Sequence, residues 1–125
     1  MQRSPLGRVG RESAGSSALP GAETTMTTFV HLDLHLDPAR LDEARGVLIE
    51  TLAATCSWPG NEGVEVLVDE ADAAHLLVVE RWAASSDHEA YARWRTTPEG
   101  RNSLGAVVVT APTKTIYPES VPLPY

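Results

Sequence analysis

Two histidines and a carboxylate alternate along a short segment near the start of the patterned part of the chain. Residues 27–36 read T-T-F-V-H-L-D-L-H-L, which places His31, Asp33 and His35 on one side of an extended strand, together with Phe29. Imidazole exchanges protons near neutral pH. Leaving a buried polar group unpaired costs about 1–3 kcal/mol. If this side is covered, a wet functional cavity explains the polar groups. A solvated sheet edge or an interfacial hydrogen-bond network without chemistry explains them equally well.

The same three residues are also metal-ligating types. Successive residues on one side of a strand lie about 6.5–7 Å apart, whereas metal–ligand bonds are near 2 Å (about 2.0–2.2 Å for zinc). Three ligands spaced as His31, Asp33 and His35 do not easily converge on one ion. We therefore expect no metal at this segment.

A second group of polar and aromatic residues lies further along the chain. On an extended segment over 75–82, one face carries Leu76, Val78, Glu80 and Trp82. On a helix that follows it, one stripe at i, i+3, i+4 and i+7 carries His88, Tyr91, Ala92 and Arg95. Trp82 is either ordinary core or part of a pocket mouth. The helical stripe is either exposed to solvent, which is the simpler expectation, or lines a polar pocket.

Other common catalytic patterns are not present in the sequence. No serine lies in a nucleophile-elbow glycine pattern, which leaves a hydrolase triad unsupported. There is also no phosphate-binding loop and no dinucleotide-binding fingerprint.

The first half of the chain predicts a strand followed by a helix. In residues 27–36 the apolar side chains recur with a period of two, which is typical of a strand. Asp37-Pro38 supplies an N-cap and a proline at the first helical position. The helix presents one apolar face and ends near Cys56, before the breaker Ser57-Trp58-Pro59-Gly60. That face comprises Leu41, Ala44, Leu48, Leu52 and Thr55.

The second half predicts two strands, a helix and a last strand region. Strands over 64–70 and 75–82 are separated by a short connection and are expected to form a hairpin. Ser86 and Glu89 have the spacing of a capping box, which predicts a helix from there to about Arg95. The last strand region covers 107–109 and 113–117.

This order of elements, β-α-β-β-α-β, predicts a ferredoxin-like α+β fold. Its two helices would cover one face of the sheet. The consecutive apolar residues Leu76, Leu77, Val78 and Val79 predict that the third strand is buried on both sides. A second copy of the chain is the simplest cover for the other face, so we expect a homodimer.

Composition and charge narrow the choice of partners. The formal net charge of −7 disfavours binding to nucleic acid or to anionic membranes. A single cysteine, Cys56, allows no internal disulfide, and we expect it to be buried in a cytoplasmic protein. We expect a disordered tail over 1–26, a folded domain over 27–117 and an extended tail over 118–125. Met26 directly precedes the first strand pattern and is a candidate start of translation.

Part of this pattern resembles the antibiotic biosynthesis monooxygenase family. The segment 75–82, His-Leu-Leu-Val-Val-Glu-Arg-Trp, ends in Glu-x-Trp and is followed by Ser85-Ser86-Asp87 and a helix with Tyr91 and Trp94-Arg95. The Trp58-Pro59-Gly60 turn also matches. The resemblance covers about residues 28 to 117. It implies a dimeric α+β barrel, in a family of cofactor-free oxygenases of aromatic polyketides and quinols, haem-degrading enzymes and proteins without a known role.

The resemblance implies a monooxygenase that oxidises a small aromatic phenol, quinol or polyketide-type molecule with O₂ and needs no cofactor. A non-catalytic, dimeric small-ligand-binding or stress-response protein is the alternative. Tyr91 stands where the family often has histidine, which disfavours haem binding. The candidate catalytic residues, expected to line one cavity, are His31, His35, Trp82, His88, Tyr91 and Arg95. The candidate substrate-binding residues are Phe29, Asp33, Val78 and Glu80.

Overall fold

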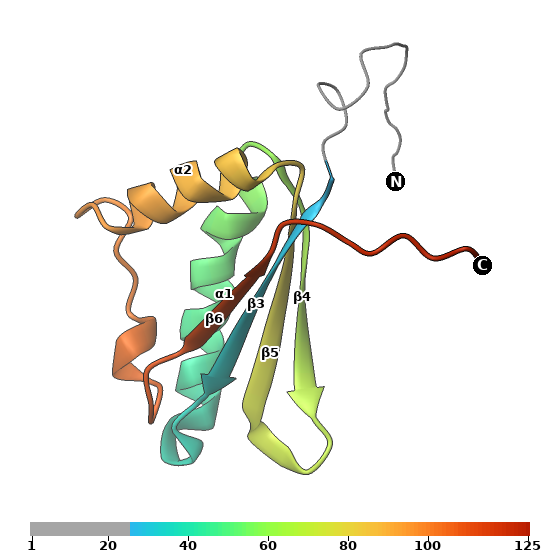
Figure 1. Ribbon diagram of the computed structural model, residues 1–125. Coiled ribbons are helices and arrows are strands. Elements are labelled where there is room, and N and C mark those ends of the chain that lie inside the picture. The colour runs from blue at the N-terminus through green and yellow to red at the C-terminus, as the bar shows by residue number, and fades with distance from the viewer. Residues whose placement is uncertain (1–25) are drawn as a thin grey trace.

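The computed structural model describes residues 26–125, which form a four-stranded antiparallel sheet with two helices on one of its faces (Figure 1). The expected tail over 1–26 therefore lies almost entirely outside the described residues. The elements are β3 (Thr28–His35), α1 (Leu41–Ser57), β4 (Asn61–Asp69), β5 (Asp72–Trp82), α2 (Ser85–Arg95) and β6 (Thr113–Tyr117), with short 3₁₀ turns η1 (Pro38–Arg40) and η2 (Leu104–Ala106). None of the described helices is long and apolar enough to cross a membrane.

The strand order β4-β5-β3-β6 confirms the predicted ferredoxin-like α+β fold. Antiparallel pairing of β3 with β5 sets Leu34 opposite Leu76. Because side chains alternate across a strand, the apolar positions of both strands face the helices together. They pack against the predicted apolar face of α1, where Ala44, Leu48 and Leu52 are buried. The main core thus lies between α1 and the two central strands.

Three local predictions are wrong. Ser86 does not cap α2: the N-cap is Ala84, without a side-chain hydrogen bond. Cys56 is exposed, because it follows Thr55 around the helix and points away from the sheet. Residues 107–109 form no full strand; Val108 makes an isolated bridge to Leu36.

The Trp58-Pro59-Gly60 turn connects α1 to β4 and lies against the start of α2. Gly60 has φ of +91°, a backbone conformation that residues with a Cβ adopt only with strain. Its carbonyl accepts a hydrogen bond of 2.8 Å from the N–H of Ala83. The side chain of Asp87 fills the space that a Cβ on Gly60 would need. This close approach fixes the position of α2 over the sheet.

The second face of the sheet carries no helix within residues 26–125 (Figure 1). Leu77 and Val79 of β5 are half-buried there, and Leu67 on the neighbouring β4 is 48% exposed. We refer to this surface as the open face. The strand β5 carries apolar residues on this face as well as on the helix-facing side, as the sequence predicts.

We predict opposite effects for two glycine-to-alanine changes. Gly60→Ala should lower the free energy of unfolding by about 1–3 kcal/mol, because a Cβ meets both the unfavourable φ and Asp87. Gly46→Ala is the control, since Gly46 lies exposed inside α1 with open space around it. It should raise the free energy by about 0.5–1 kcal/mol. Thermal unfolding measures both, and a neutral Gly60→Ala would contradict the tight turn.

Candidate functional site

A cavity of about 160 Å³ lies between the helix-facing side of the sheet and the helices. Its floor comes from β3, β5 and β6, and its walls come from α1, α2 and the segment after α2. The lining combines apolar, hydroxyl and charged side chains: Val30, Leu32, Leu48, Thr51, Leu52, Glu80, His88, Tyr91, Arg95, Asn102, Leu104 and Lys114. A small, mostly apolar space with a few ionisable groups is typical of a site for a small ligand.

Glu80 on β5 is an ionisable group in the wall of this cavity and is only 5% exposed. The indole N–H of Trp82 donates a hydrogen bond of 3.0 Å to Oε1 of Glu80. Burial raises the pKa of Glu80, and the hydrogen bond from Trp82 and the charges of Lys114 and Arg95 oppose the rise. The carboxyl group therefore retains its proton to higher pH than an exposed glutamate does.

His88, on the first turns of α2, is 4% exposed. Burial lowers its pKa, and the positive charge of Lys114 lowers it further. The ring packs at an angle against Trp82, with ring centroids 5.6 Å apart. His88 is thus a neutral imidazole at neutral pH, and a neutral imidazole can accept a proton.

Arg95 fixes the wall of the cavity through several hydrogen bonds. Its Nε donates to the hydroxyl of Tyr91 over 2.6 Å, and that hydroxyl also lies 2.6 Å from Oγ1 of Thr55. Its Nη2 donates to the carbonyl of Thr51 over 2.7 Å, and its Nη1 to the carbonyl of Gly100 over 3.1 Å. The guanidinium group therefore ties α1, α2 and the following loop together and sets its positive charge beside the cavity.

The helical stripe of α2 faces inward, so the simpler expectation of an exposed stripe is wrong. His88 and Tyr91 are buried and line the cavity together with Arg95. Trp82 and Val78 are fully buried and are not part of the cavity lining. Trp82 lies behind the cavity lining, where it packs against His88 and hydrogen-bonds to Glu80. Val78 belongs to the main core, because α1 covers that part of β5.

The two histidines of β3 do not reach this cavity, so the six candidate catalytic residues do not line one space. Val30 and Leu32 form part of the cavity wall. Alternation along the strand then turns their neighbours to the open face. These neighbours are Phe29, His31, Asp33 and His35. The ring of His31 packs against Tyr117 there, with centroids 5.0 Å apart.

The sequence analysis missed Lys114, Thr51 and Asn102. Lys114 lies opposite Leu32 in the pairing of β6 with β3, and therefore on the helix-facing side. The alternation in T-K-T-I-Y could have revealed this once the pairing was known. Thr51 lies one helical turn after Leu48 and directly before Leu52, and because it is polar it was not assigned to the apolar face of the helix. Asn102 lies in a loop, where no periodic pattern applies.

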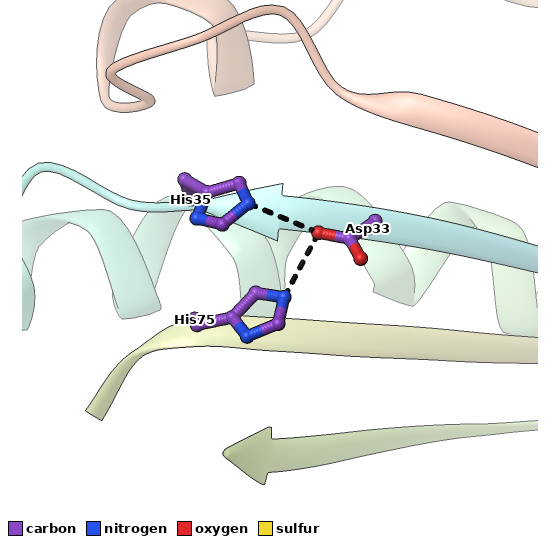
Figure 2. Close-up of side chains that lie close together, drawn as sticks. All are labelled: Asp33, His35 and His75. Carbon is purple, nitrogen blue, oxygen red and sulfur yellow. Dashed lines mark hydrogen bonds and ion pairs between the residues drawn. The ribbon is translucent and has the colours of Figure 1, made fainter. Parts of the chain in front are cut away.

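The open face holds a separate polar group, formed by Asp33, His35 and His75 (Figure 2). Oδ1 of Asp33 lies 3.3 Å from Nε2 of His35 and 3.0 Å from Nε2 of His75. His75 was not singled out, although it pairs directly with His35 across β3 and β5. The spacing along one strand led us to expect no metal-ligating group at His31, Asp33 and His35, because it could not show that His75 of the next strand joins Asp33 and His35.

Comparison with known proteins places the chain by its fold. No protein-family model matches the sequence, and no curated protein matches it as a relative. Solved structures do match. A conserved protein from Methanosarcina mazei Go1 aligns with a TM-score of 0.67 and 13% identity, over 77% of this chain and 95% of that one.

Two further matches are described as candidate antibiotic biosynthesis monooxygenases. The one from Nitrosomonas europaea has a TM-score of 0.66 and 13% identity, over 79% of this chain and 95% of that one. The one from Deinococcus radiodurans has a TM-score of 0.64 and 19% identity, over 78% of this chain and 97% of that one. At these identities the comparison shows the fold alone: this chain has the fold of antibiotic biosynthesis monooxygenases.

Proposed function

We propose that this protein is a cofactor-independent monooxygenase that oxidises a small phenol or hydroquinol with O₂ in the cavity lined by Glu80, His88 and Arg95. The observation that carries the proposal is the neutral, buried imidazole of His88 beside the positive charges of Arg95 and Lys114. Together these groups can remove a phenolic proton and stabilise the resulting anion. The matched folds described as monooxygenases support the same reaction class.

The volume of the cavity favours a substrate with one aromatic ring. A cavity of about 150 Å³ is known to hold benzene, and this cavity measures about 160 Å³. A molecule with several fused rings, such as an aromatic polyketide, would need the cavity to widen. A one-ring phenol or hydroquinol therefore fits this cavity better than an aromatic polyketide does.

The electrons for the reaction come from the substrate. Oxygen chemistry usually requires a cofactor, but a phenolate is rich enough in electrons to reduce O₂ itself. One oxygen atom forms a new bond to a ring carbon, and the other leaves as water. A phenol thereby becomes a quinone, and a hydroquinol becomes a hydroxyquinone. The cavity excludes bulk water from the anion and from the peroxide that forms on it.

Each ionisable group of the cavity lining has a distinct part in this scheme. His88 takes the phenolic proton as the general base. Arg95 and Lys114 stabilise the phenolate by their charge. Glu80 keeps its proton to raised pH and can hydrogen-bond to the developing peroxide. Tyr91 is held by Arg95 and Thr55, and it shapes the wall against which the ring lies.

We also propose that the protein works as a homodimer joined through the open face. Leu77 and Val79 give this face an apolar centre, and Glu65 of β4 and Arg81 of β5 bring opposite charges to it. A face that carries both apolar residues and both signs of charge can pair with itself across a two-fold axis. The cavity lies on the other side of the sheet and would stay accessible in such a dimer.

Oxygen uptake by metal-stripped protein tests the proposed reaction. One-ring phenols and hydroquinols should be consumed faster than three-ring anthrones, and labelled O₂ should leave one labelled atom in the product. His88→Ala should lower the rate by about 10²- to 10⁴-fold. Arg93→Ala changes an exposed residue of the same helix, and as the control it should keep the wild-type rate. If no compound is oxidised but phenols still quench the tryptophan fluorescence, the protein binds phenols without oxidising them and the proposed activity is wrong.

Glu80→Gln should make the protein more stable at high pH. Below the ordinary pKa of glutamate, the carboxyl group is protonated in both the folded and the unfolded chain. As the pH rises above that value, the unfolded chain ionises first, because burial raises the pKa of Glu80 in the folded state. The wild type therefore loses stability toward neutral pH, and the glutamine variant does not.

The melting temperatures of the two proteins should thus diverge as the pH rises above the ordinary glutamate pKa of about 4.3. Glu89→Gln changes an exposed glutamate of α2 and should show no such divergence. A difference that stays constant over the whole pH range would show that Glu80 is not desolvated in the folded protein.

Val79→Asp should convert the proposed dimer into a folded monomer. Val79 is half-buried at the centre of the open face, so a carboxylate there would be desolvated without a partner in the dimer but hydrated in the monomer. Light scattering measures the mass, and circular dichroism checks the fold. Val78→Asp is the contrasting variant: it should unfold the chain, because Val78 lies in the core. A wild-type monomer at micromolar concentration would refute the dimer.

A further inference from the structure

The group formed by Asp33, His35 and His75 lies on the opposite face of the sheet from the cavity. Asp33 and His35 come from the end of β3, and His75 comes from the start of β5 (Figure 2). One ligand atom from each residue lies within 4.8 Å of the other two. All three side chains are at least partly exposed in the single chain, so an ion can reach them before two copies pair through the open face. The proposed reaction does not use them.

The distances suit a metal ion. Donor atoms in a tetrahedral zinc site lie about 3.4 Å apart, given bonds of about 2.1 Å. Oδ1 of Asp33 lies 3.3 Å and 3.0 Å from the Nε2 atoms of His35 and His75. The two imidazole rings are stacked, with centroids 4.5 Å apart and an angle of 5° between their planes. Both Nε2 atoms thus lie beside the same carboxylate oxygen, and the rings must tilt out of the stacked arrangement to direct both lone pairs at one ion.

His75 also has the kind of hydrogen-bond partner that metal-bound histidines usually have. Metal-bound histidines usually donate their second ring N–H to a carboxylate, which fixes the tautomer. Nδ1 of His75 lies 2.8 Å from Oδ2 of Asp69, at the end of β4. With its proton on Nδ1, His75 presents the lone pair of Nε2 toward Asp33 and His35.

The charge of the group calls for a cation. Nε2 of His75 lies within hydrogen-bond distance of Oδ1 of Asp33 and Nδ1 within that of Oδ2 of Asp69, so one imidazole ring bridges two carboxylates. A divalent cation would balance both carboxylates at once. The formal net charge of the chain, −7, favours a cation further.

We propose that Asp33, His35 and His75 bind one divalent transition-metal ion, with Asp69 orienting His75. Two imidazoles and one carboxylate suit zinc, cobalt or copper and disfavour magnesium and calcium, which prefer oxygen ligands alone. Three protein ligands leave at least one position for water or another group. The ion would join the ends of β3 and β5 and, through Asp69, the end of β4.

Calorimetric titration of the full-length, untagged protein with Zn²⁺ tests this site. One ion should bind per chain, and the melting temperature should rise with zinc concentration. Co²⁺ should bind in competition and give visible absorption bands that two nitrogen ligands and one oxygen ligand produce. Asp69→Asn should weaken zinc binding by about 10- to 100-fold, because it removes the acceptor for Nδ1–H.

His35→Ala and His75→Ala should each abolish stoichiometric binding. His31→Ala is the matched control, since His31 shares the strand and the open face with His35 but not the group. It should bind zinc as the wild type does. His35 is exposed, so His35→Ala decides the result if His75→Ala fails to fold. The proposal is wrong if zinc does not bind at millimolar concentration, or if binding survives His35→Ala, or if His31→Ala weakens it equally.

Discussion

The alternation of side chains along β3 governs how polar chemistry is distributed in this molecule. The strand lies in the centre of the sheet and pairs with both β5 and β6, so neither of its faces can shift without breaking two sets of hydrogen bonds. Its even-numbered residues build the core and the cavity wall, and its odd-numbered residues build the open face. One strand thus supplies two separate sites that cannot share a side chain.

The ionisable groups of the cavity come at a cost in stability. Glu80 and His88 both lie where their charged forms are poorly solvated, and the pKa of each moves toward the neutral form. A purely apolar pair would pack there without this penalty. Arg95 offsets part of the cost by joining two helices and a loop through its hydrogen bonds. The rigidity of the site and the charge beside it therefore come from one residue.

The order of elements, the apolar faces of β3 and α1 and the hairpin were predictable, because they depend on local periodicity. The helical spacing of His88, Tyr91 and Arg95 also identified these three residues of the site. It could not show whether this stripe of α2 faces the sheet or the solvent. Two kinds of information were missing. Lys114 and His75 needed the pairing of strands far apart in sequence, and Asn102 needed the path of a loop. The prediction of a cap at Ser86 failed because α2 already begins at Ser85, whose hydroxyl lies 2.8 Å from the hydroxyl of Thr28.

The position of Lys114 has a consequence for the motion of the protein. β6 has only five residues, all of them exposed, and it pairs with β3 alone at the edge of the sheet. Short edge strands exchange their amide hydrogens through local fluctuations that need far less free energy than global unfolding. Because one cavity-lining charge lies on this strand, fraying of the edge moves that charge and widens the cavity in the same event. Local opening of β6 would therefore also open a path from solvent into the cavity.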